Sequence, residues 1–191
     1  MEILIISILS YLVGSIPFGF ILIKFFLKKD IRDIGSGNIG ATNVLRTGNK
    51  FLGYGTLFLD IIKAVIPVVY VKLNYPDYIF ITSLCIFLGH VFPIWLKFKG
   101  GKGVATYIGI LFSINLNIGF VFVAVWFLTF LISKYSSLSS MIGSLGVPIY
   151  LFFFTTQNLV FFSIMFILII YTHRENIKRL KNKEESKTKI Y

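Results

Sequence analysis

Three polar segments interrupt a strongly apolar sequence, and each combines glycine, amide, hydroxyl or basic residues. They cover residues 35–46, residues 89–106 and residues 173–180. Glycine allows backbone N–H groups to converge on an oxyanion without interference from a Cβ atom. Hydroxyl groups and basic side chains add the charge-assisted hydrogen bonds that hold a phosphate. The segments therefore predict a phosphate-binding site, and the alternative is that they are flexible linkers.

The candidate phosphate-binding side chains lie in the first two segments. We expect Ser36, Arg46 and Lys102 to hold phosphate, because they combine a hydroxyl group with two positive charges. The residues expected to shape or line the first loop are Asn38, Gly40, Thr42 and Asn43. The residues expected to complete the binding loop around Lys102 are Gly100, Gly101, Gly103 and Thr106. A helix should begin just after the last of these glycines, and its N-terminal dipole would favour an anion.

The third segment supplies a candidate acid–base group. His173 and Asn176 are three positions apart, so they share one face of a helix and place a titratable group beside a neutral hydrogen-bond donor. We expect these two residues, together with Lys102 and Ser36, to be the catalytic residues. Arg179, on the same segment, is expected to support them.

The elements that position these residues are expected to be membrane helices. Hydrophobic residues make up 56% of the 191 residues and charged residues 14%, against about 45–50% and about 25% in soluble domains. The net charge of +11 would favour nucleic-acid binding in a soluble protein. Here the basic residues stand at the ends of apolar runs, as in the cytoplasmic loops of membrane proteins. The Gly-x-Gly-x-x-Gly pattern at residues 35–40 lacks the preceding strand of a dinucleotide site. We therefore expect an all-α polytopic membrane protein that binds no nucleic acid.

The apolar runs predict a bundle of seven transmembrane helices. The first three runs cover residues 3–23, 51–72 and 79–96. Residues 104–132 would form about 43 Å of helix, too long for one span and short for two, so we expect a break at Asn115–Asn117. The same reasoning breaks the next run at Thr155–Asn158.

The distribution of basic residues places the N-terminus outside and the C-terminus in the cytoplasm. Five spans with re-entrant segments are the alternative, with the same orientation of both ends. In both cases the three polar segments meet on the cytoplasmic face. Residues 1–191 are expected to form one domain, with a solvated basic tail from about residue 181.

Asp60 and Lys63 are charged residues inside an apolar run. Such charges are expensive in a membrane, so a pair that faces the interior of the bundle is the natural arrangement. Two interpretations stay open, a buried structural tether and a wall of the polar site. His90, near the end of a span, is either a hydrogen-bonding core residue or part of the site.

At these segments the sequence resembles the bacterial integral-membrane glycerol-3-phosphate acyltransferases that use acyl phosphate, the PlsY family. The matching residues extend over nearly the whole chain, and they are Gly14–Pro17, Ser36–Asn43, Arg46, Leu59–Asp60, Lys63, Gly89–His90, Phe98–Thr106, Ser136–Ser137, His173–Arg174, Asn176–Ile177 and Arg179. Ala64 stands where a glycine is more usual in this family.

The resemblance implies transfer of an acyl group from acyl phosphate to the 1-hydroxyl group of sn-glycerol 3-phosphate, the first acylation of phospholipid synthesis. The products would be 1-acylglycerol 3-phosphate (lysophosphatidate) and inorganic phosphate. The resemblance also implies no cofactor and no metal, and a partner enzyme that makes the acyl phosphate. The protein would lie in the bacterial inner membrane, with its active site on the cytoplasmic face.

An organic-phosphate transporter would use the same anion-binding groups. Transport sites usually lie near the middle of the membrane, between internal repeats. Here the polar segments are expected on one side, and the sequence has no visible repeat. A lipid-scaffolding protein with merely basic loops is a third hypothesis, and the density of glycine, asparagine and histidine in the segments disfavours it. We therefore favour acyl transfer.

Overall fold

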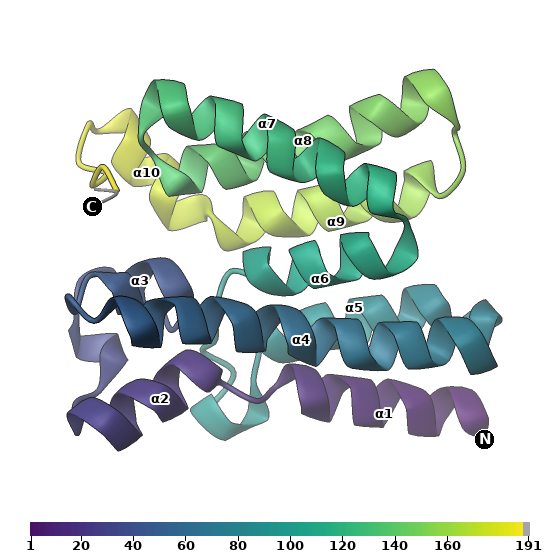
Figure 1. The fold of residues 1–191 in the computed structure, drawn as a ribbon, viewed down its shortest axis with the longest axis horizontal. Coiled ribbons are helices and arrows are strands. Elements are labelled where there is room, and N and C mark those ends of the chain that lie inside the picture. Colours follow the sequence, from purple (N-terminus) through teal and green to yellow (C-terminus); the bar gives the residue numbers. More distant parts are fainter. Residues whose placement is uncertain (189–191) are drawn as a thin grey trace. The chain divides into compact units, whose positions relative to one another are not determined.

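The computed structural model describes residues 1–188, and no strand occurs in that part of the chain (Figure 1). The last three residues of the predicted tail, 189–191, lie outside the described residues. The helices fall into two compact units, an N-terminal unit of residues 1–114 and a C-terminal unit that begins at residue 115. The helices of the N-terminal unit are α1 (Glu2–Gly14), α2 (Phe18–Leu27), η1 (Ile31–Asp33), α3 (Ala41–Leu45), α4 (Lys50–Asn74), η2 (Pro76–Tyr78), α5 (Ile79–Val91), η3 (Ile94–Leu96) and α6 (Val104–Ile114). Those of the C-terminal unit are α7 (Leu116–Ser133), α8 (Ser136–Phe154), α9 (Leu159–Thr172) and α10 (Arg174–Lys181).

Four segments of the described chain are long and apolar enough to cross a membrane, namely Glu2–Leu27, Pro76–Leu96, Leu116–Ser133 and Ser136–Phe154. The pair of α9 and α10, bent by 58°, makes a fifth if it crosses as one span. α4 has the length but carries Asp60 and Lys63, and the 11 residues of α6 rise only about 16 Å. The structure thus confirms an all-helical protein with several membrane helices, whereas the count of seven spans stays a prediction.

The two predicted helix breaks are confirmed. α6 ends at Ile114, and Asn115 caps α7 by accepting a hydrogen bond from the N–H of Asn117 at 2.8 Å. α8 ends at Phe154 and α9 begins at Leu159. An amide side chain that accepts from the first turn of the next helix replaces a missing helix hydrogen bond.

A further break, at Ser15–Pro17, divides the first apolar run into α1 and α2. Proline has no N–H group and restricts the residue before it. The break turns the Ile16 carbonyl away from the helix ladder, where it accepts a hydrogen bond from Lys63 Nζ at 2.8 Å.

α1 and α5 approach closely because glycines face each other across their interface. A Cβ atom at Gly14 would overlap the backbone of Ile86, and one at Gly89 would overlap the backbone of Tyr11 and Ser15. Small residues at such points allow helix backbones to touch in membrane proteins. This contact fixes the C-terminal half of α5, from which the second polar segment continues.

α4 is the central helix of the N-terminal unit and contacts α1, α2, α3, α5 and α6. Near its end, Lys72 Nζ donates to the carbonyl oxygens of Ser113 and Ile114 at 2.9 and 3.0 Å. These carbonyls belong to the last turn of α6, where a cation is favoured by both the open acceptors and the helix dipole. Lys72 therefore caps the C-terminal end of α6.

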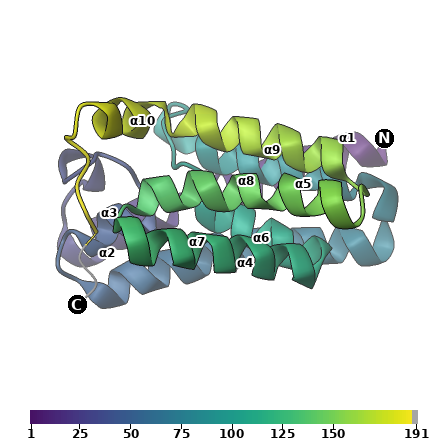
Figure 2. The same cartoon turned by 90° about the horizontal axis from the view of Figure 1, so that it is seen from above.

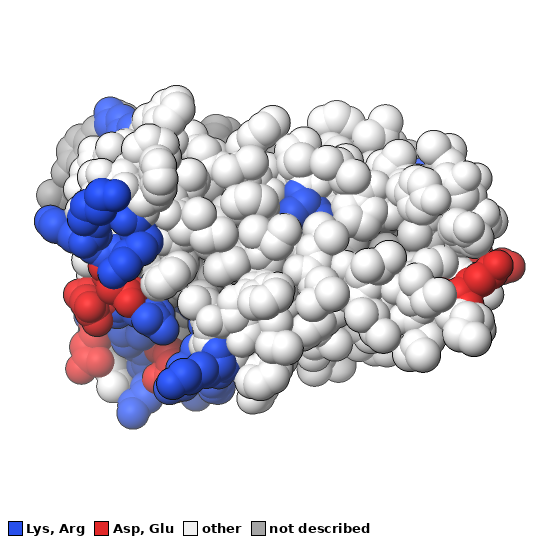
Figure 3. All heavy atoms as spheres, turned by 90° about the horizontal axis from the view of Figure 1, so that it is seen from below, with Lys and Arg blue, Asp and Glu red and all other residues white. Residues whose placement is uncertain are grey.

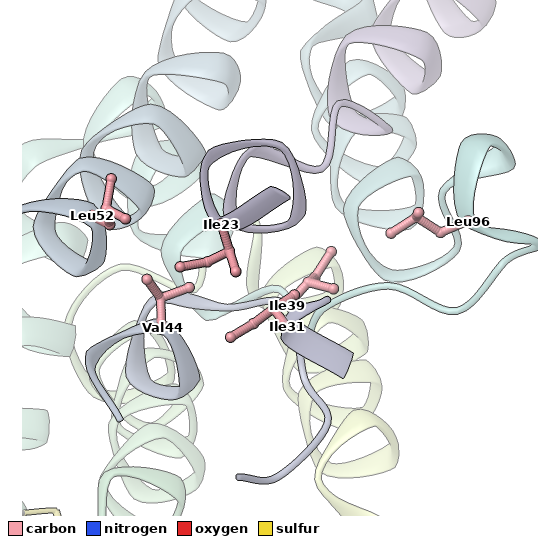
Figure 4. Close-up of a cluster of buried hydrophobic side chains, with 6 residues drawn as sticks. All are labelled: Ile23, Ile31, Ile39, Val44, Leu52 and Leu96. Atoms are coloured by element: carbon pink, nitrogen blue, oxygen red, sulfur yellow. The ribbon is translucent and has the colours of Figure 1, made fainter. Parts of the chain in front are cut away.

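A cluster of buried apolar side chains holds the first two polar segments at the same end of the N-terminal unit. Figure 4 shows its members, which are Ile23, Ile31, Ile39, Val44, Leu52 and Leu96. They come from α2, from the first segment and its approach, from α4 and from η3. The first two segments thus lie together as predicted.

Basic side chains gather at this end. On the face shown in Figure 3, Lys and Arg cluster where α2 ends and α3 lies (Figure 1). The exposed basic residues of α2, η1 and the turn between them are Lys24, Lys28, Lys29 and Arg32. This is the charge pattern of a cytoplasmic loop.

In the C-terminal unit, α7, α8 and α9 run alongside one another (Figures 1 and 2). Gly143 and Gly146 of α8 face Phe122 and Val125 of α7, with a Cβ atom at Gly146 only 3.1 Å from the Val125 side chain. α10 bends away after His173 and carries the third polar segment.

We predict that Gly89→Leu destabilises the protein, because the new side chain would meet backbone atoms of α1 that cannot move aside. Overpacking of this kind costs about 1–3 kcal/mol, and the melting temperature of the purified protein in detergent should fall by several degrees. Gly55→Ala is the matched control, since its Cβ atom would lie 3.8 Å from Leu22 Cδ1 and alanine favours a helix. Unchanged melting of the Gly89→Leu variant would contradict this account of the interface.

Candidate active site

Asn43 organises the first polar segment from its interior. Its side chain is buried, and its Nδ2 donates to the carbonyl oxygens of Ile31, Ile34 and Asn38 at 3.2, 2.8 and 2.8 Å. Its Oδ1 accepts from the N–H of Ser36 at 2.9 Å. All the polar atoms of this amide are therefore used within the loop. Asn43 shapes the loop, as expected, while its buried position leaves the outer surface to other residues.

The backbone N–H groups of this loop also bond within it. The N–H of Ser36 donates to Asn43, that of Gly37 to the Ile34 carbonyl at 3.0 Å, and that of Gly40 to Asn38 Oδ1 at 2.9 Å. The expectation that glycine lets these N–H groups converge on an oxyanion is therefore wrong for these three donors.

Side chains on the outside of the first loop are placed differently. Ser36 and Arg46 are exposed, and Thr42 is half-buried in the first turn of α3. A Cβ atom at Gly35 would overlap Asn43 Oδ1, and the φ angle of 57° at Gly35 lies in the left-handed region, so glycine is required there. The loop thus presents a hydroxyl group and a guanidinium on a backbone that Asn43 fixes.

At the start of this loop, Asp30 and Arg32 form an exposed ion pair with Nη2 2.6 Å from Oδ2. Hydrogen bonds from the Arg32 side chain lower the pKa of Asp30 to about 2. Exposed pairs contribute little to stability because water and salt screen them. The pair orders the turn before η1 and leaves Arg32 as a surface charge.

The glycines of the second segment fit against the C-terminal end of α5. A Cβ atom at Gly100 would overlap the His90 carbonyl oxygen, one at Gly101 the His90 ring, and one at Gly103 the Phe87 ring. At Gly103 the φ angle of 82° is also left-handed. These glycines therefore permit a close approach between the loop and α5.

Two N–H groups of this loop are consumed by the same approach. The N–H of Gly100 donates to the Val91 carbonyl and that of Gly101 to the His90 carbonyl, both at 3.0 Å. The expectation that these glycines offer their N–H groups to an oxyanion is wrong at both positions, because the end of α5 has open carbonyls that need donors. Lys102, which follows, is half-buried.

α6 begins at Val104, immediately after the glycine loop, as predicted. Thr106 lies in its first turn and is fully buried, and its Oγ1 has no hydrogen-bond partner among residues 1–188. The start of α6 therefore lies next to Lys102, while the Thr106 hydroxyl faces the protein interior.

Asp60, Lys63 and His90 form a buried polar centre in the N-terminal unit. Lys63 Nζ lies 2.6 Å from Asp60 Oδ1 and 3.0 Å from His90 Nδ1, and the Asp60 and His90 side chains lie 3.7 Å apart. The exposed fraction of each residue is 4% or less. The predicted pairing of Asp60 with Lys63 is confirmed, and His90 joins the pair.

His173 follows the last residue of α9, and a hydrogen bond determines which nitrogen of its neutral ring carries the proton. Its Nδ1 lies 2.8 Å from the Ile169 carbonyl oxygen, and a carbonyl can only accept, so Nδ1 carries the proton. In the neutral ring Nε2 then has the lone pair and is the atom that can accept a proton. The residue is 2% exposed.

Asn176, in the first turn of α10, is held by a carboxylate from the tail. Its Nδ2 donates to Glu185 Oε1 at 2.6 Å, as does Ser137 Oγ at 2.6 Å. Arg179 Nε donates to the other oxygen, Oε2, at 2.7 Å. Asn176 Oδ1 is buried and has no hydrogen-bond partner within the described part of the chain. Asn176 therefore offers Oδ1 as an acceptor, whereas its Nδ2, the expected donor, already donates to Glu185.

Glu185 is the residue that sequence reasoning missed. It lies in the tail expected to be solvated, where Lys181 and Lys183 are exposed, whereas the side chain of Glu185 is 6% exposed. Burial alone would raise the pKa of Glu185, but the hydrogen bonds from Ser137, Arg179 and Asn176 lower it below its ordinary value. No pattern in the Lys- and Glu-rich tail distinguishes it from its neighbour Glu184.

Within the described residues, no group of three or more His, Cys, Asp or Glu side chains could hold a metal ion. Ser36, Arg46, Lys102 and the glycine loop belong to the N-terminal unit, and His173, Asn176 and Arg179 to the C-terminal unit. That all three segments meet on one face stays a prediction.

Comparison with known proteins agrees with these motifs. The family described as glycerol-3-phosphate acyltransferase matches residues 4–183. A glycerol-3-phosphate acyltransferase of Pelagibacter ubique is 76% identical over 191 residues, which is 100% of both chains. One of Bradyrhizobium diazoefficiens is 48% identical over 182 residues, covering 94% of this chain and 92% of the relative. The chain belongs to the glycerol-3-phosphate acyltransferase family.

Solved structures place this acyltransferase in the PlsY type. The crystal structure of PlsY, an integral membrane glycerol 3-phosphate acyltransferase, in its glycerol 3-phosphate form has a TM-score of 0.92 and 36% identity. The matched region covers 98% of this chain and 96% of the PlsY chain. The lysophosphatidic acid form has a TM-score of 0.88, with 98% and 95% covered. This acyltransferase is thus an integral, multi-pass membrane protein, as expected from its sequence.

We predict that Glu185→Gln destabilises this acyltransferase. The NH₂ group of glutamine would replace one carboxylate oxygen and would face a donor that this oxygen now accepts from. Loss of one such charged partner costs about 1–3 kcal/mol, and the melting temperature should fall by several degrees at neutral pH. Glu184→Gln is the control, since Glu184 is exposed.

The pH dependence has a definite sign. The folded pKa of Glu185 is lowered, so its stabilisation is present above the ordinary glutamate pKa and is lost as the pH falls toward the lowered folded value. The melting temperatures of the Glu185→Gln variant and the unchanged protein should therefore converge on acidification. A constant difference between them down to low pH would contradict the assignment.

Proposed function

We propose that the protein transfers an acyl group from acyl phosphate to the 1-hydroxyl group of sn-glycerol 3-phosphate. The products are 1-acylglycerol 3-phosphate and inorganic phosphate, and the reaction is the first acylation of phospholipid synthesis. The observation that carries this proposal is the similarity of nearly the whole chain to a PlsY structure in a glycerol 3-phosphate form. The lysophosphatidic acid form of that neighbour supports the nature of the product.

Acyl phosphate is a mixed anhydride with a good leaving group. The hydroxyl oxygen of glycerol 3-phosphate forms the new bond to the acyl carbon, the bond from that carbon to the phosphate oxygen breaks, and the hydroxyl proton leaves with a base. No covalent intermediate on the enzyme is required. Catalysis then depends on the positioning of two phosphate-bearing substrates and on the stabilisation of charge.

Ser36, Arg46 and Lys102 are the proposed phosphate-binding residues. Support comes from the loops themselves, because five backbone N–H groups in them already bond to protein acceptors. Phosphate recognition then falls to side chains, and Arg and Lys provide charge-assisted hydrogen bonds. Asn38, Thr42 and Asn43 shape the first loop, and the glycines from Gly100 to Gly103 shape the second.

His173 and Asn176 are the proposed catalytic residues of the C-terminal unit. The Nδ1–H of His173 is bonded to Ile169, so Nε2 can accept a hydrogen bond or a proton from the glycerol hydroxyl. The buried Oδ1 of Asn176 is a second acceptor and favours orientation of that hydroxyl. A phosphate oxygen of the substrate is the alternative proton acceptor, in which case His173 only orients the hydroxyl group.

We infer that the reaction takes place at the cytoplasmic face of the bacterial inner membrane, with the N-terminus outside and the C-terminus in the cytoplasm. The basic cluster at the α2–α3 end supports this orientation (Figure 3). Seven spans require that α4 and the short α6 also cross. A site at this interface takes glycerol 3-phosphate from water and the acyl phosphate, supplied by the enzyme that makes it, from the bilayer.

The purified protein should form lysophosphatidate from labelled glycerol 3-phosphate with palmitoyl phosphate and not with palmitoyl-CoA. Lys102→Ala should raise the KM for glycerol 3-phosphate about tenfold or more, since one charged hydrogen bond contributes about 1.5–3 kcal/mol. Lys99→Ala is the matched control, because Lys99 is exposed in the same loop and should leave KM unchanged.

Product from palmitoyl-CoA alone would refute the proposed donor. A normal KM in the Lys102→Ala variant would refute the proposed role of Lys102. If neither donor gives product, exchange of labelled organic phosphate across vesicles containing the protein would test the transporter hypothesis instead.

His173→Gln distinguishes the two roles of His173. Glutamine places an acceptor near the position of Nε2 but cannot take a proton at neutral pH. If His173 is the general base, kcat should fall by about 10²–10⁴-fold with little change in KM. If a substrate phosphate takes the proton, the variant should keep most of its kcat. His173→Ala, which removes the acceptor as well, should lose activity in both cases.

A further inference from the structure

The buried polar centre of Asp60, Lys63 and His90 is arranged around the ammonium group of Lys63. Lys63 is surrounded by Asp60 Oδ1 at 2.6 Å, the Ile16 carbonyl at 2.8 Å and His90 Nδ1 at 3.0 Å. A charged ammonium group has three donors and no acceptor, and Lys63 donates to the Ile16 carbonyl and to His90 Nδ1 while its charge pairs with Asp60. Lys63 therefore ties together three elements, α4, the break between α1 and α2, and the end of α5.

The same contacts determine the state of the His90 ring. Because Lys63 donates to Nδ1, this nitrogen carries the lone pair and the proton of the neutral ring lies on Nε2. The ring is therefore fixed at Nδ1 by Lys63, while its Nε2 edge lies against the glycine loop. A Cβ atom at Gly101 would overlap Nε2.

His90 holds the loop through its backbone as well. Its carbonyl oxygen accepts from the N–H of Gly101 at 3.0 Å, and Gly100 leaves no room for a Cβ atom next to that oxygen. One residue thus supports two consecutive glycines, with the ring under Gly101 and the carbonyl against both. Lys102 is the next residue along the chain.

The approach to this loop is strained and needs such support. Lys97 and Phe98 have φ angles of 52° and 61°, and two consecutive non-glycine residues in the left-handed region cost about 1–3 kcal/mol each. Such a backbone persists only where its surroundings determine it. On its N-terminal side the strained segment is held by the hydrogen bond from the N–H of Phe98 to the Pro93 carbonyl, and on its C-terminal side by the contacts of Gly100 and Gly101 with the end of α5.

We propose that Asp60, Lys63 and His90 are positioning residues for Lys102. Asp60 pairs with Lys63, and Lys63 donates to the His90 ring. The ring packs against Gly101 and so determines the position of the Gly101 peptide, from which the chain continues to Lys102. Of the two interpretations of Asp60 and Lys63, this proposal favours the buried structural tether, which here acts through the loop. It rests on the proposed phosphate-binding role of Lys102.

His90→Asn is the principal test variant. Asparagine can still accept a hydrogen bond from Lys63, so neither charge of the ion pair is left alone, but its side chain is too short to support Gly101. Lys72→Met is the matched control, because Lys72 also lies on α4 and donates to two carbonyl oxygens, at the end of α6. Gly101→Ala displaces the ring without changing any member of the centre.

Hydrogen–deuterium exchange of peptides that cover residues 98–104 measures the loop directly, without a catalytic reaction. In the unchanged protein the N–H groups of Gly100 and Gly101 are bonded and should exchange slowly. His90→Asn and Gly101→Ala should speed exchange there at least tenfold, with no change in peptides from α8. Lys72→Met should leave exchange of residues 98–104 unchanged.

Kinetics then show whether the loop acts through Lys102. His90→Asn should raise the KM for glycerol 3-phosphate about tenfold and change kcat by less than threefold. In the Lys102→Ala background the same substitution should raise KM no further, since residues that act through one group are not additive. Asp60→Asn combined with Lys63→Met, which removes both charges together, should behave as His90→Asn does.

Unchanged exchange in the His90→Asn variant overturns the proposal, whatever reaction the protein catalyses. Additive effects of His90→Asn and Lys102→Ala on KM overturn it as well. A normal KM in Lys102→Ala alone is a different result, because it refutes the proposed phosphate-binding role while the exchange measurement still reports on the loop. If His90→Asn does not fold, the Gly101→Ala variant provides the same two measurements.

Discussion

Helices that break inside a membrane protein leave carbonyl groups without partners, and this constraint governs the whole N-terminal unit. A buried polar group without a hydrogen bond costs several kcal/mol in an apolar environment. Three side chains meet the demand. Lys63 bonds to the Ile16 carbonyl at the α1–α2 break, Tyr11 Oη donates to the Phe92 carbonyl at 2.7 Å at the end of α5, and Lys72 closes α6. The helices are thus joined where each is interrupted.

The same constraint applies to the glycine-rich loops. Five of their N–H groups donate to carbonyl or amide oxygens of the protein. Glycine is needed at Gly100 and Gly101 for contact with α5, and at Gly35 for contact with Asn43. In the proposed function, ligand binding therefore falls to side chains of these loops. A rigid backbone that presents a few charged side chains limits the entropy lost on binding.

Sequence reasoning identified the helical class, the breaks at Asn115 and Thr155–Asn158, and the three polar segments, because each depends on residue types along a short stretch. The family resemblance rests on the same local patterns. The direction of individual hydrogen bonds was not accessible in this way. Whether the N–H of Gly101 faces a ligand or the His90 carbonyl depends on the tertiary approach of α5, and the sequence of the loop is compatible with both.

Glu185 is the clearest limit of such reasoning. Its carboxylate joins Ser137 of α8 to Asn176 and Arg179 of α10. Ser137 is far from Glu185 along the chain, and the tail between α10 and Glu185 has no pattern that predicts the contact. Glu184 has the same chemistry and is exposed. Only the folded arrangement separates the two, because burial and three donors depend on where the tail turns after α10.

Because Glu185 follows α10, a protease that cuts the exposed tail would separate this carboxylate from the rest of the C-terminal unit. Lys181 and Lys183 are exposed, and cleavage after either would detach Glu185 while leaving α7, α8 and α9 uncut. The carboxylate that holds Asn176 would be lost, and the helical content measured by circular dichroism would hardly change. A preparation nicked at this point would thus look folded by its spectrum and yet lack the anchor of a candidate catalytic residue.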